Sequence, residues 1–422
     1  MVHASRTTPN DNGIVGVLDV GTFKIVCLIA ALPAAGTPGA GLRLLGIGHR
    51  KARGIKASVI ADPDLAEAAV RAAISQAERM AGAALDTVYL SVASGRLKSL
   101  NFDAATDIAE RVVGDGDIAR VLAAGRAYGE RDGRAVLHLQ ALGYRVDGGL
   151  DTEVPNGLVG RRLTAGLHAV VADDAPLRSL LDLAGRCKLR VAGLAAAPYA
   201  SAIAVTSENE RRHGVVTIDM GGGSTTLAIF VAGRFVYATA LPVGSHHATY
   251  DLARRLSTSL AEAERIKTLH GTIVRAPSDA TERIAYQYTG GGEPAPAEIG
   301  KAEVAGIIAP RVASLFAMLA ERIDHSGIPA ERIGSVVLTG GASQLVGVAD
   351  FASSVLGRPV RIGRPVSIDG RSARVLGPAF ATAAGLMATV LDPQAGVRCE
   401  ELAELSGGGY LGRVGQWLRA GF

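Results

Sequence analysis

Residues 215–231 constrain the fold of this chain more than any other stretch. An apolar, β-branched run ends at Asp219, three glycines and a serine follow, and a second apolar run occupies residues 227–231. This order is typical of a strand, a tight turn and a returning strand. Glycine lets such a turn adopt positive φ and brings backbone N–H groups close to a ligand. The stretch is therefore either an ordinary β-hairpin or a loop that binds phosphate.

A second copy of the pattern near the N-terminus favours the phosphate loop. Residues 15–24 repeat the order of apolar run, aspartate, apolar residue, glycine and hydroxyl, with Asp19 in the place of Asp219. A returning strand follows at residues 25–31. Repetition of one supersecondary unit in the two halves of a chain implies two similar domains. We expect the two loops to face each other across a cleft and to clamp the β- and γ-phosphates of a nucleotide.

The residue types in the two loops suit phosphate and magnesium. Several N–H groups that point the same way form a concavity for anions. Mg²⁺ keeps most of its waters and takes few carboxylates, so Asp19 and Asp219 would hold it through water. The loop residues predicted to bind ATP and Mg²⁺ are Asp19, Gly21, Thr22, Phe23, Lys24, Asp219, Gly221, Gly222, Gly223, Ser224 and Thr225. A glycine pair after a predicted strand, Gly340 and Gly341, is expected to approach the nucleoside.

Composition indicates a folded globular protein of several domains. The chain has 422 residues, of which 48% are hydrophobic and 4% aromatic, and a formal net charge of +4. These values argue against nucleic acid as a partner, which normally needs a clustered basic face. The three widely spaced cysteines, Cys27, Cys187 and Cys399, are typical of a reducing cytosol rather than a metal site. Residues 1–13 contain no signal-peptide core, and no run approaches the ~20 apolar residues of a membrane-spanning helix.

The residues between the two loops predict a first domain with an insert. An Asp-Pro pair marks the start of a helix at residues 62–80. Residues 95–162 carry more charge and glycine than their surroundings, with short strands at 136–140 and 144–146. This part is predicted to be a small α+β insert. Residues 167–172 are then predicted to return to the main domain as a strand.

The second half of the chain is predicted to be mainly helical beyond its phosphate loop. Residues 288–297 are rich in glycine and proline and are predicted to form a loop. Two helices of small residues, 195–205 and 377–390, could pack closely and form a hinge between the halves. The other helical patterns lie at 246–255, 259–270 and 301–324.

The C-terminal residues combine a polar stretch with an amphipathic one. Residues 392–409 are acidic and end in glycines, which predicts a flexible linker. Residues 410–422 place apolar side chains on one face of a helix and arginines on the other. Such a helix either docks on the protein's own surface or lies in the interface of an anionic membrane, because it is too short to span one. The predicted membrane residues are Leu411, Val414, Trp417, Leu418 and Phe422, with Arg413 and Arg419 near the lipid headgroups.

Taken together, the motifs resemble those of a known superfamily. In the order of the phosphate and adenosine motifs of the actin-like ATPases, the chain carries LDVGTFK, IDMGGGSTT and VVLTGG. Residues 72–93, 136–138, 264–267 and 416–422 are similar to the bacterial cell-division protein FtsA. The resemblance covers residues 14–422. It implies an actin-like, ribonuclease H-like α/β fold with two lobes and duplicated domains around a nucleotide cleft.

The resemblance also implies partners and a location. Glu264 and Lys267 would lie beside the adenine and ribose, and Arg311 would contact the C-terminal tail of the tubulin-like division protein FtsZ. The implied function is an ATP-binding protein that polymerises on the cytoplasmic face of the inner membrane and anchors FtsZ there at the division septum. The insert would meet neighbouring copies and later division proteins. The implied subdomains are lobe 1 (1A, residues 13–94 and 163–206), the insert (1C, 95–162), lobe 2 (2A, 207–245 and 326–391), 2B (246–325), the linker (392–409) and the membrane helix (410–422).

One departure from the family pattern bears on catalysis. Thr226 stands where family members often carry an acidic residue, and Ser224 replaces the usual threonine. Fewer carboxylates leave less charge to position a metal or an attacking water, so we expect weak ATP hydrolysis at most. One alternative is a sugar-kinase-like or phosphatase enzyme of the same superfamily, which needs a carboxylate base facing the γ-phosphate. Another is a peptide-binding chaperone, which needs a β-rich substrate domain after residue 391.

Overall fold

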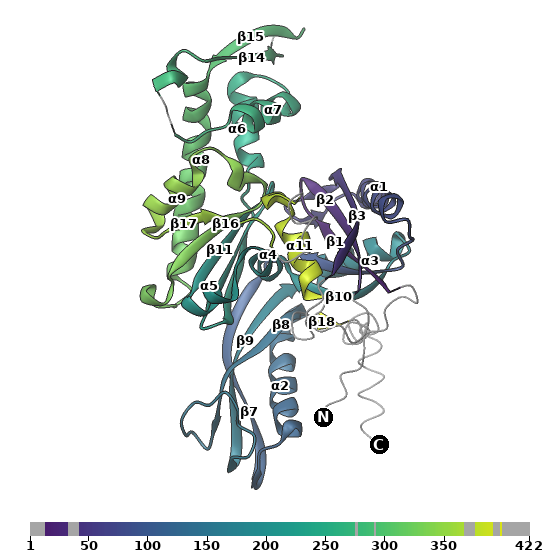
Figure 1. The fold of residues 1–422 in the computed structure, drawn as a ribbon, viewed down its shortest axis with the longest axis vertical. Coiled ribbons are helices and arrows are strands. Elements are labelled where there is room, and N and C mark those ends of the chain that lie inside the picture. Colours follow the sequence, from purple (N-terminus) through teal and green to yellow (C-terminus); the bar gives the residue numbers. More distant parts are fainter. Residues whose placement is uncertain are drawn as a thin grey trace.

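The chain folds into two α/β lobes with a smaller unit at each end. The computed structural model describes residues 13–32, 42–274, 277–290, 293–366, 376–390 and 397–398. The lobes lie side by side, an insert extends from one end of the molecule, and a mainly helical unit extends from the other (Figure 1). The helices between the lobes are α4 (Ala197–Val205) and α11 (Ala381–Thr389).

Lobe 1 is built on a six-stranded sheet with the strand order β18-β10-β6-β1-β2-β3. Its strands are β1 (Ile14–Val20), β2 (Lys24–Ala31), β3 (Arg43–Lys51), β6 (Thr87–Val92), β10 (Arg190–Ala196) and β18 (Val397–Arg398). β1 runs antiparallel to β2 and parallel to β6. The two strands of the first hairpin are apolar nearly throughout, because both faces of the sheet are covered. The helices that flank this lobe are α1 (Pro63–Ala81) and α3 (Asp174–Arg186).

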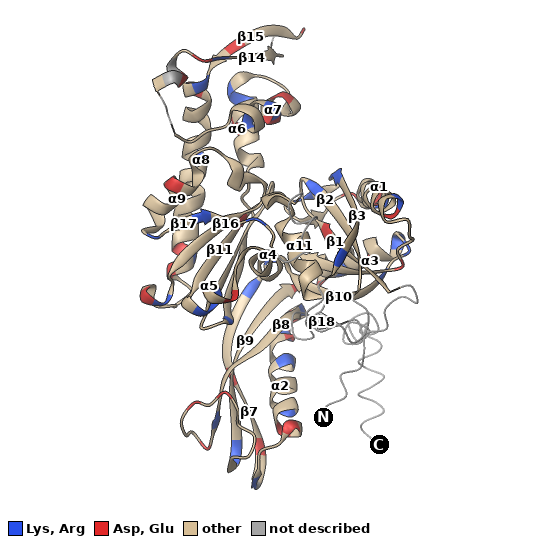
Figure 2. Ribbon diagram, viewed as in Figure 1, with Lys and Arg blue, Asp and Glu red and all other residues tan. Residues whose placement is uncertain are grey.

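Helix α1 begins where the Asp-Pro pair predicts. The side chain of Asp62 accepts two backbone N–H hydrogen bonds of 3.1 Å, and Pro63 occupies the first helical position. Gly82 ends the helix in the left-handed conformation. Charges of both signs are interspersed on this surface (Figure 2), where Arg186 of α3 pairs with Glu67 of α1 at 2.6 Å. The caps therefore define the ends of α1, and the ion pair links α1 to α3.

Lobe 2 repeats the arrangement of lobe 1. β11 (Val215–Met220) runs antiparallel to β12 (Thr225–Val231) and parallel to β16 (Ser335–Thr339), as β1 does with β2 and β6. The sheet continues through β17 (Val360–Ile362) on one side and β13 (Arg234–Leu241) on the other. The duplication predicted from the repeated loops is therefore confirmed. Further elements of the two lobes are β4 (Ile55–Lys56), β5 (Val59–Ile60), α5 (Glu208–His213), α9 (Val348–Leu356) and the short 3₁₀ turns η4 (Gly341–Gln344) and η5 (Pro378–Phe380).

The insert is an α+β unit, as predicted, but its strands are long. It consists of β7 (Lys98–Val112), α2 (Asp115–Gly129), β8 (Arg134–Val146) and β9 (Val159–Asp173). The short strands predicted at 136–140 and 144–146 belong to the single strand β8. Residues 167–172, predicted to return to the main domain, instead lie in β9 and pair with β7 and β8. Irregular register between β8 and β9 interrupts the apolar alternation, and this makes the strands look shorter in the sequence.

The insert also joins the sheet of lobe 2. Lys98 of β7 pairs with Thr239 of β13, so the two sheets form one eight-stranded sheet with the order β17-β16-β11-β12-β13-β7-β9-β8. The chain enters and leaves the insert from lobe 1. The insert is therefore attached to both lobes.

The unit at the other end contains the three predicted helices and one unpredicted hairpin. Its elements are α6 (His246–Leu256), α7 (Leu260–His270), α8 (Lys301–Asp324), β14 (Arg283–Tyr288) and β15 (Ala295–Gly300). Residues 288–297 were expected to form a loop, but the strands β14 and β15 extend into this range and pair with each other. Pro296 lies within β15, and a proline is tolerated there because this isolated hairpin has free edges.

Helix α8 departs from one expectation. Among the described residues it is long and apolar enough to cross a membrane by length and composition alone, whereas no such run is expected from the sequence. In the structure its buried stripe, which includes Ile308, Leu315 and Phe316, packs in the hydrophobic core of lobe 2. Periodic burial of this kind is typical of a core helix.

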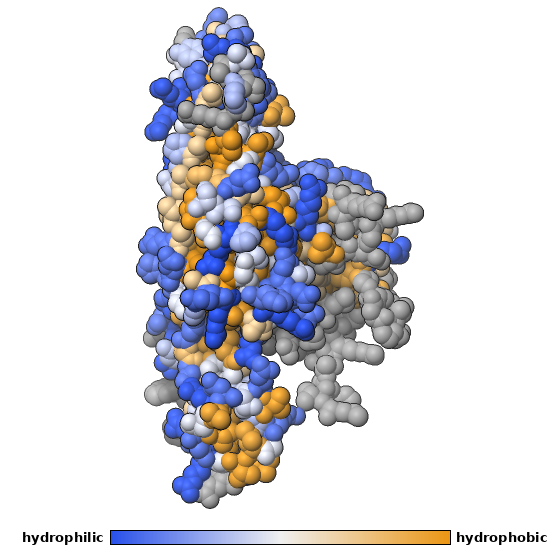
Figure 3. Space-filling view, turned by 60° about the vertical axis from the view of Figure 1, so that its left-hand side comes forward, coloured by the Kyte–Doolittle hydropathy of each residue, from blue (hydrophilic) through white to orange (hydrophobic). Residues whose placement is uncertain are grey.

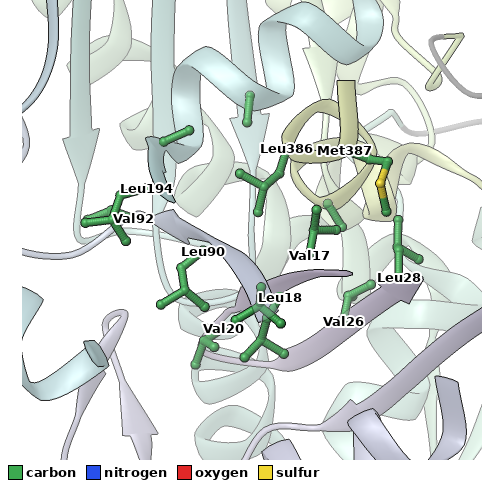
Figure 4. Packing of buried hydrophobic residues seen from close by; sticks show 14 of the residues in the cluster. Val17, Leu18, Val20, Val26, Leu28, Leu90, Val92, Leu194, Leu386 and Met387 are labelled. Carbon is green, nitrogen blue, oxygen red and sulfur yellow. The ribbon is translucent and has the colours of Figure 1, made fainter. Parts of the chain in front are cut away.

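The predicted pairing of the two small-residue helices is confirmed. A Cβ atom added to Gly385 of α11 would lie 1.6 Å from the carbonyl oxygen of Ala200 in α4, so only glycine permits this crossing. On its other side α11 packs on lobe 1, where Leu386 and Met387 lie against Val17 and Leu28 (Figure 4). Helix α11 therefore connects the core of lobe 1 with the helix that precedes lobe 2.

The structure corrects the start of the predicted linker. Val397 and Arg398, expected within a flexible tether at 392–409, form the edge strand β18 and pair with β10. The predicted membrane helix at residues 410–422 lies outside the described residues.

Candidate functional site

The two glycine turns have the same geometry. In the first, the N–H of Gly21 donates to the carbonyl oxygen of Lys24 at 3.1 Å, and in the second, Gly221 donates to Ser224 at 3.0 Å. We call residues 21–24 loop 1 and residues 221–224 loop 2. Each connects an aspartate-bearing strand to its antiparallel partner, so the sequence repeat is also a repeat of backbone conformation.

The loops contact each other, as predicted for a shared cleft. A Cβ atom on Gly222 would lie 2.7 Å from the Cβ of Phe23, and one on Gly223 would lie 2.5 Å from the Cγ2 of Thr22. Glycine at these positions therefore allows loop 2 to approach loop 1. The ring of Phe23 also packs against His246, the first residue of α6, with the ring centroids 5.8 Å apart.

The predicted site residues converge on a cavity of about 450 Å³ between the lobes. Its lining includes residues from both loops, from α7 and from the glycine pair after β16. The predicted residues that line it are Asp19, Gly21, Thr22, Phe23, Lys24, Asp219, Gly221, Gly222, Gly223, Ser224, Glu264, Lys267, Gly340 and Gly341. Residues separated by more than 300 positions in the sequence thus lie around one space.

Thr225 is the exception and is replaced by its neighbour. Its hydroxyl donates to the carbonyl oxygen of Val243 at 2.7 Å, away from the cavity. Thr226 lines the cavity instead, because successive residues of a strand point to opposite faces. Thr226 lies directly across the ladder from Asp219, and cross-strand partners share a face. The pairing of these two residues could have identified Thr226 from the sequence.

Asp219 is held mainly by α11. The hydroxyl of Thr382 in this helix donates to its Oδ2 at 2.8 Å, whereas the hydroxyl of Ser201 in α4 donates to the carbonyl oxygen of Pro198 at 3.3 Å. Gly340 has a φ of 83° and leaves room for Asp219, because a Cβ there would lie 2.3 Å from Oδ1. Burial and the nearby Asp19 raise the pKa of Asp219 to about 6, against the opposing effects of Thr382 and Lys24. A bound cation would favour the ionised form of this carboxylate.

Asp19 and Lys24 form the equivalent part of lobe 1. Ser91 donates to Oδ1 of Asp19 at 2.5 Å, and burial raises the pKa of this carboxyl. The ammonium of Lys24 donates to the carbonyl oxygen of Ala379 at 2.6 Å and lies 3.6 Å from the ring centroid of Phe380. Burial lowers the pKa of Lys24. The lysine of loop 1 is therefore engaged by η5, immediately before α11.

The other end of the cavity carries a second charged pair. Lys267 and Glu264, one turn apart on α7, form an ion pair of 2.7 Å. Thr249 donates to the same Glu264 oxygen at 2.6 Å and accepts from Lys267 at 2.8 Å. Burial opposes ionisation of Glu264, but the bonds from Lys267 and Thr249 outweigh it and lower its pKa. Burial lowers the pKa of Lys267.

The donor set fits a phosphate group with a hydrated magnesium ion. The loops offer backbone N–H groups and hydroxyls, and the buried Oγ1 of Thr226 has no hydrogen-bond partner within the protein. An unpartnered buried polar atom beside a cavity calls for a ligand or water. Among the described residues there is no group of three or more His, Cys, Asp or Glu side chains that could hold a metal by itself. Mg²⁺ does not need such a group, because it can be held by two carboxylates through its bound waters.

Sequence reasoning missed several polar residues of the site. They come from elements without a local motif, so only the tertiary structure brings them to the loops. They are Ser58, Ser91 and Thr382.

The fold and the cleft define an actin-like protein. The structure matches the PilM-PilN type IV pilus biogenesis complex with a TM-score of 0.65 at 16% identity, over 91% of this chain and 100% of the other. It matches MreB5 of Spiroplasma citri with a TM-score of 0.54 at 14% identity, over 90% and 97% of the two chains. These similarities confirm the predicted two-lobed α/β fold.

Sequence comparison identifies the family within this fold class. A model of the cell division protein FtsA matches residues 216–385, and one of the SHS2 domain inserted in FtsA matches residues 94–171. The cell division protein FtsA of Rhizobium meliloti is 39% identical over 97% of this chain and 95% of its own length. That of Escherichia coli K12 is 29% identical over 98% and 99%. The chain belongs to the cell division protein FtsA family, which confirms the resemblance seen in the motifs.

Proposed function

We propose that the cleft binds ATP with Mg²⁺. The observation that carries this proposal is the convergence of two matching glycine turns on one cavity that contains two buried carboxylates. MreB5 of Spiroplasma citri, which shares the fold, has been solved bound to ADP and to AMPPNP. The N–H groups and hydroxyls of the loops would hold the phosphates, and Asp19 and Asp219 would hold the waters of Mg²⁺. Glu264 and Lys267 would lie beside the nucleoside.

The same geometry favours a nucleotide-dependent scaffold over a kinase or phosphatase. Among the described residues, the carboxylates that line the cavity are Asp19, Asp219 and Glu264. The first two are assigned to the metal, and Glu264 is neutralised by Lys267. No carboxylate of the described lining is then left to act as a base on a second substrate. Thr226 provides a hydroxyl where a charge would assist hydrolysis, so we expect ATPase activity to be weak at most.

Asp219→Asn is expected to have opposite effects on stability and on nucleotide binding. The pKa of this carboxyl rises from 3.8 to about 6 on folding. The free energy of unfolding therefore falls as the pH rises from about 4 to about 6, and the full decrease is present at pH 7. Removing the charge should raise the unfolding free energy of the nucleotide-free protein by roughly 1–3 kcal/mol. It should weaken Mg²⁺-dependent ATP binding at least tenfold. Thermal unfolding and calorimetry measure the two effects. Unchanged ATP affinity would refute the metal role.

For the C-terminal residues we propose attachment to the cytoplasmic face of the inner membrane. The support is the helical spacing of Leu411, Val414, Trp417, Leu418 and Phe422, with Arg413 and Arg419 on the polar face. A helix this short binds an anionic surface reversibly, because few apolar side chains are buried and two arginines add ~1 kcal/mol each. Many copies in one filament would bind far more tightly through effective concentration. Polymerisation and membrane attachment would then be coupled.

We further propose that the helical unit receives the tail of FtsZ and that the insert meets other copies and later division proteins. Arg311 of α8 makes two hydrogen bonds to Asp251 of α6, at 2.8 and 3.1 Å, and remains 39% exposed. Asp251 therefore fixes the orientation of the guanidinium, whose exposed part can donate to an acidic peptide. Hydrophobic side chains gather at the end of the insert (Figure 3), as expected for a contact surface. The exposed apolar residues there are Val112, Leu150, Val154, Leu158 and Val159.

Flotation with anionic liposomes tests attachment and recruitment together. With ATP and Mg²⁺, the full chain should float and carry a peptide of the FtsZ tail with it. Deletion of residues 410–422 should abolish flotation but not binding of the peptide in solution. Arg311→Glu should do the reverse, with flotation of the protein and loss of the peptide. Flotation of the truncated chain would refute the membrane role of the C-terminus.

A further inference from the structure

A short hairpin of lobe 1 has an unfavourable turn beside the cavity. Strands β4 and β5 are joined by Ala57 and Ser58, whose φ angles are 46° and 62°. Two-residue turns with both residues left-handed are normally made by Asn-Gly or similar pairs, because a Cβ disfavours this backbone conformation. Strained backbone of this kind persists where the surroundings hold it in place, often at functional sites.

Ser58 is held in place by both phosphate loops. Its backbone N–H donates to the hydroxyl of Thr22 in loop 1 at 2.8 Å, and its own hydroxyl lies 3.1 Å from the hydroxyl of Ser224 in loop 2. Either hydroxyl can donate in the second contact. Ser58 lines the cavity together with Thr22 and Ser224. The tip of the hairpin therefore joins the two lobes at the phosphate end of the cleft.

The hydrogen bond between the Ser58 and Ser224 hydroxyls can be replaced by a bond from Ser58 to a phosphate oxygen. A neutral hydroxyl pair is weak, whereas a hydroxyl that donates to an anionic oxygen makes a stronger bond. The residue of loop 1 that corresponds to Ser224 is Lys24, whose ammonium is engaged by Ala379. Ser58 is thus a donor that can turn from Ser224 to a phosphate without breaking an ion pair.

We propose that the hydroxyl of Ser58 binds the terminal phosphate of the nucleotide. This inference rests on the proposed binding of ATP in the cleft. With the terminal phosphate present, the Ser58 hydroxyl donates to it and the hairpin closes over the loops. Without it, the hydroxyl returns to Ser224. Ser58 therefore makes the site prefer ATP over ADP. Its contact with Ser224, which joins the two lobes, is broken when the terminal phosphate is present and formed when it is absent.

Calorimetric titration of the full chain with ATP and with ADP, in Mg²⁺, tests this inference. Ser58→Ala should weaken ATP binding about tenfold, as expected for the loss of one bond to a charged group, and should change ADP binding less than twofold. Ser58→Gly, which relieves the backbone strain while it also removes the hydroxyl, should show the same loss of ATP preference. Ala57→Gly is the matched control, because it relieves strain at the neighbouring residue and should keep the preference.

The outcomes separate the two proposals. An equal change in ATP and ADP affinity for both Ser58 variants, or no change, overturns the role of Ser58 and leaves nucleotide binding intact. A loss of ATP preference in Ala57→Gly as large as in the Ser58 variants also overturns it, because the turn and not the hydroxyl would then be responsible. A wild-type chain that binds neither nucleotide overturns the proposed function and this inference with it.

Discussion

Replacement of Gly385 by alanine is expected to destabilise the protein by about 2 kcal/mol, although the same change inside an ordinary helix is stabilising. The new Cβ would lie 1.6 Å from the carbonyl oxygen of Ala200. Since that oxygen belongs to the backbone of α4, the clash can be relieved only if the helices move apart. Because Thr382 of α11 donates to Asp219, movement of α11 should displace this carboxylate, and ATP affinity should fall together with stability.

Gly377→Ala provides the matched control for this prediction. A Cβ at Gly377 meets nothing within 4 Å, so the substitution should be neutral or slightly stabilising. Urea unfolding of the nucleotide-free proteins measures both changes. If Gly385→Ala were as stable as Gly377→Ala, the close crossing of α4 and α11 would be wrong.

Acidification from pH 7 to pH 5 is expected to remove about 4 kcal/mol of folding free energy through two buried histidines. Burial lowers the pKa of His138 to about 3, with a further contribution from His168, and burial lowers that of His168 to about 4. Both histidines have a reference pKa of 6.5. Between that value and pH 4 the unfolded chain binds protons that the folded chain does not. The stabilisation is therefore complete above pH 6.5 and is lost as the pH falls.

The location of these histidines makes the effect testable by substitution. They lie where the insert meets the lobes, and the ring of each packs edge-on against Phe235. Nε2 of His138 accepts the backbone N–H of Ala196 at 2.9 Å. His138→Gln keeps an acceptor but cannot titrate, so it should reduce the loss of stability between pH 7 and pH 5 by about 2 kcal/mol, as measured by urea unfolding at each pH. His325→Gln, at the exposed end of α8, serves as the control. An undiminished acid loss in His138→Gln would contradict the assignment.

The core of the site could be predicted from the sequence because its signals are local. An aspartate at a strand end followed by glycine specifies both the turn and its chemistry, and the repeat at Asp19 and Asp219 specifies two lobes. The structure brings all of the predicted loop residues except Thr225 to one cavity. Proximity to the glycines favours Thr225, whereas the strand alternation assigns the cavity face to Thr226.

The parts that could not be predicted depend on contacts between distant segments. Ser58 and Thr382 lie in segments without a motif, and they reach the site only through the hairpin β4–β5 and the crossing of α11 over α4. The full length of β8 could not be predicted, because its register with β9 is irregular and this interrupts the alternation of apolar and polar residues. Local pattern therefore identified the chemistry of the loops, whereas the residues that support and bridge them required the tertiary structure.

Strand β18 limits how far the body of the molecule can stand from a lipid surface. Because Val397 and Arg398 are paired with β10, only residues 399–409 separate the edge of lobe 1 from the segment at 410–422. Even fully extended, that stretch spans at most about 40 Å. Strand β18 lies beside β10, about midway between the helical unit and the insert (Figure 1). With the terminal segment on the bilayer, as proposed, the docked strand would set an upper limit on the distance between lobe 1 and the lipid.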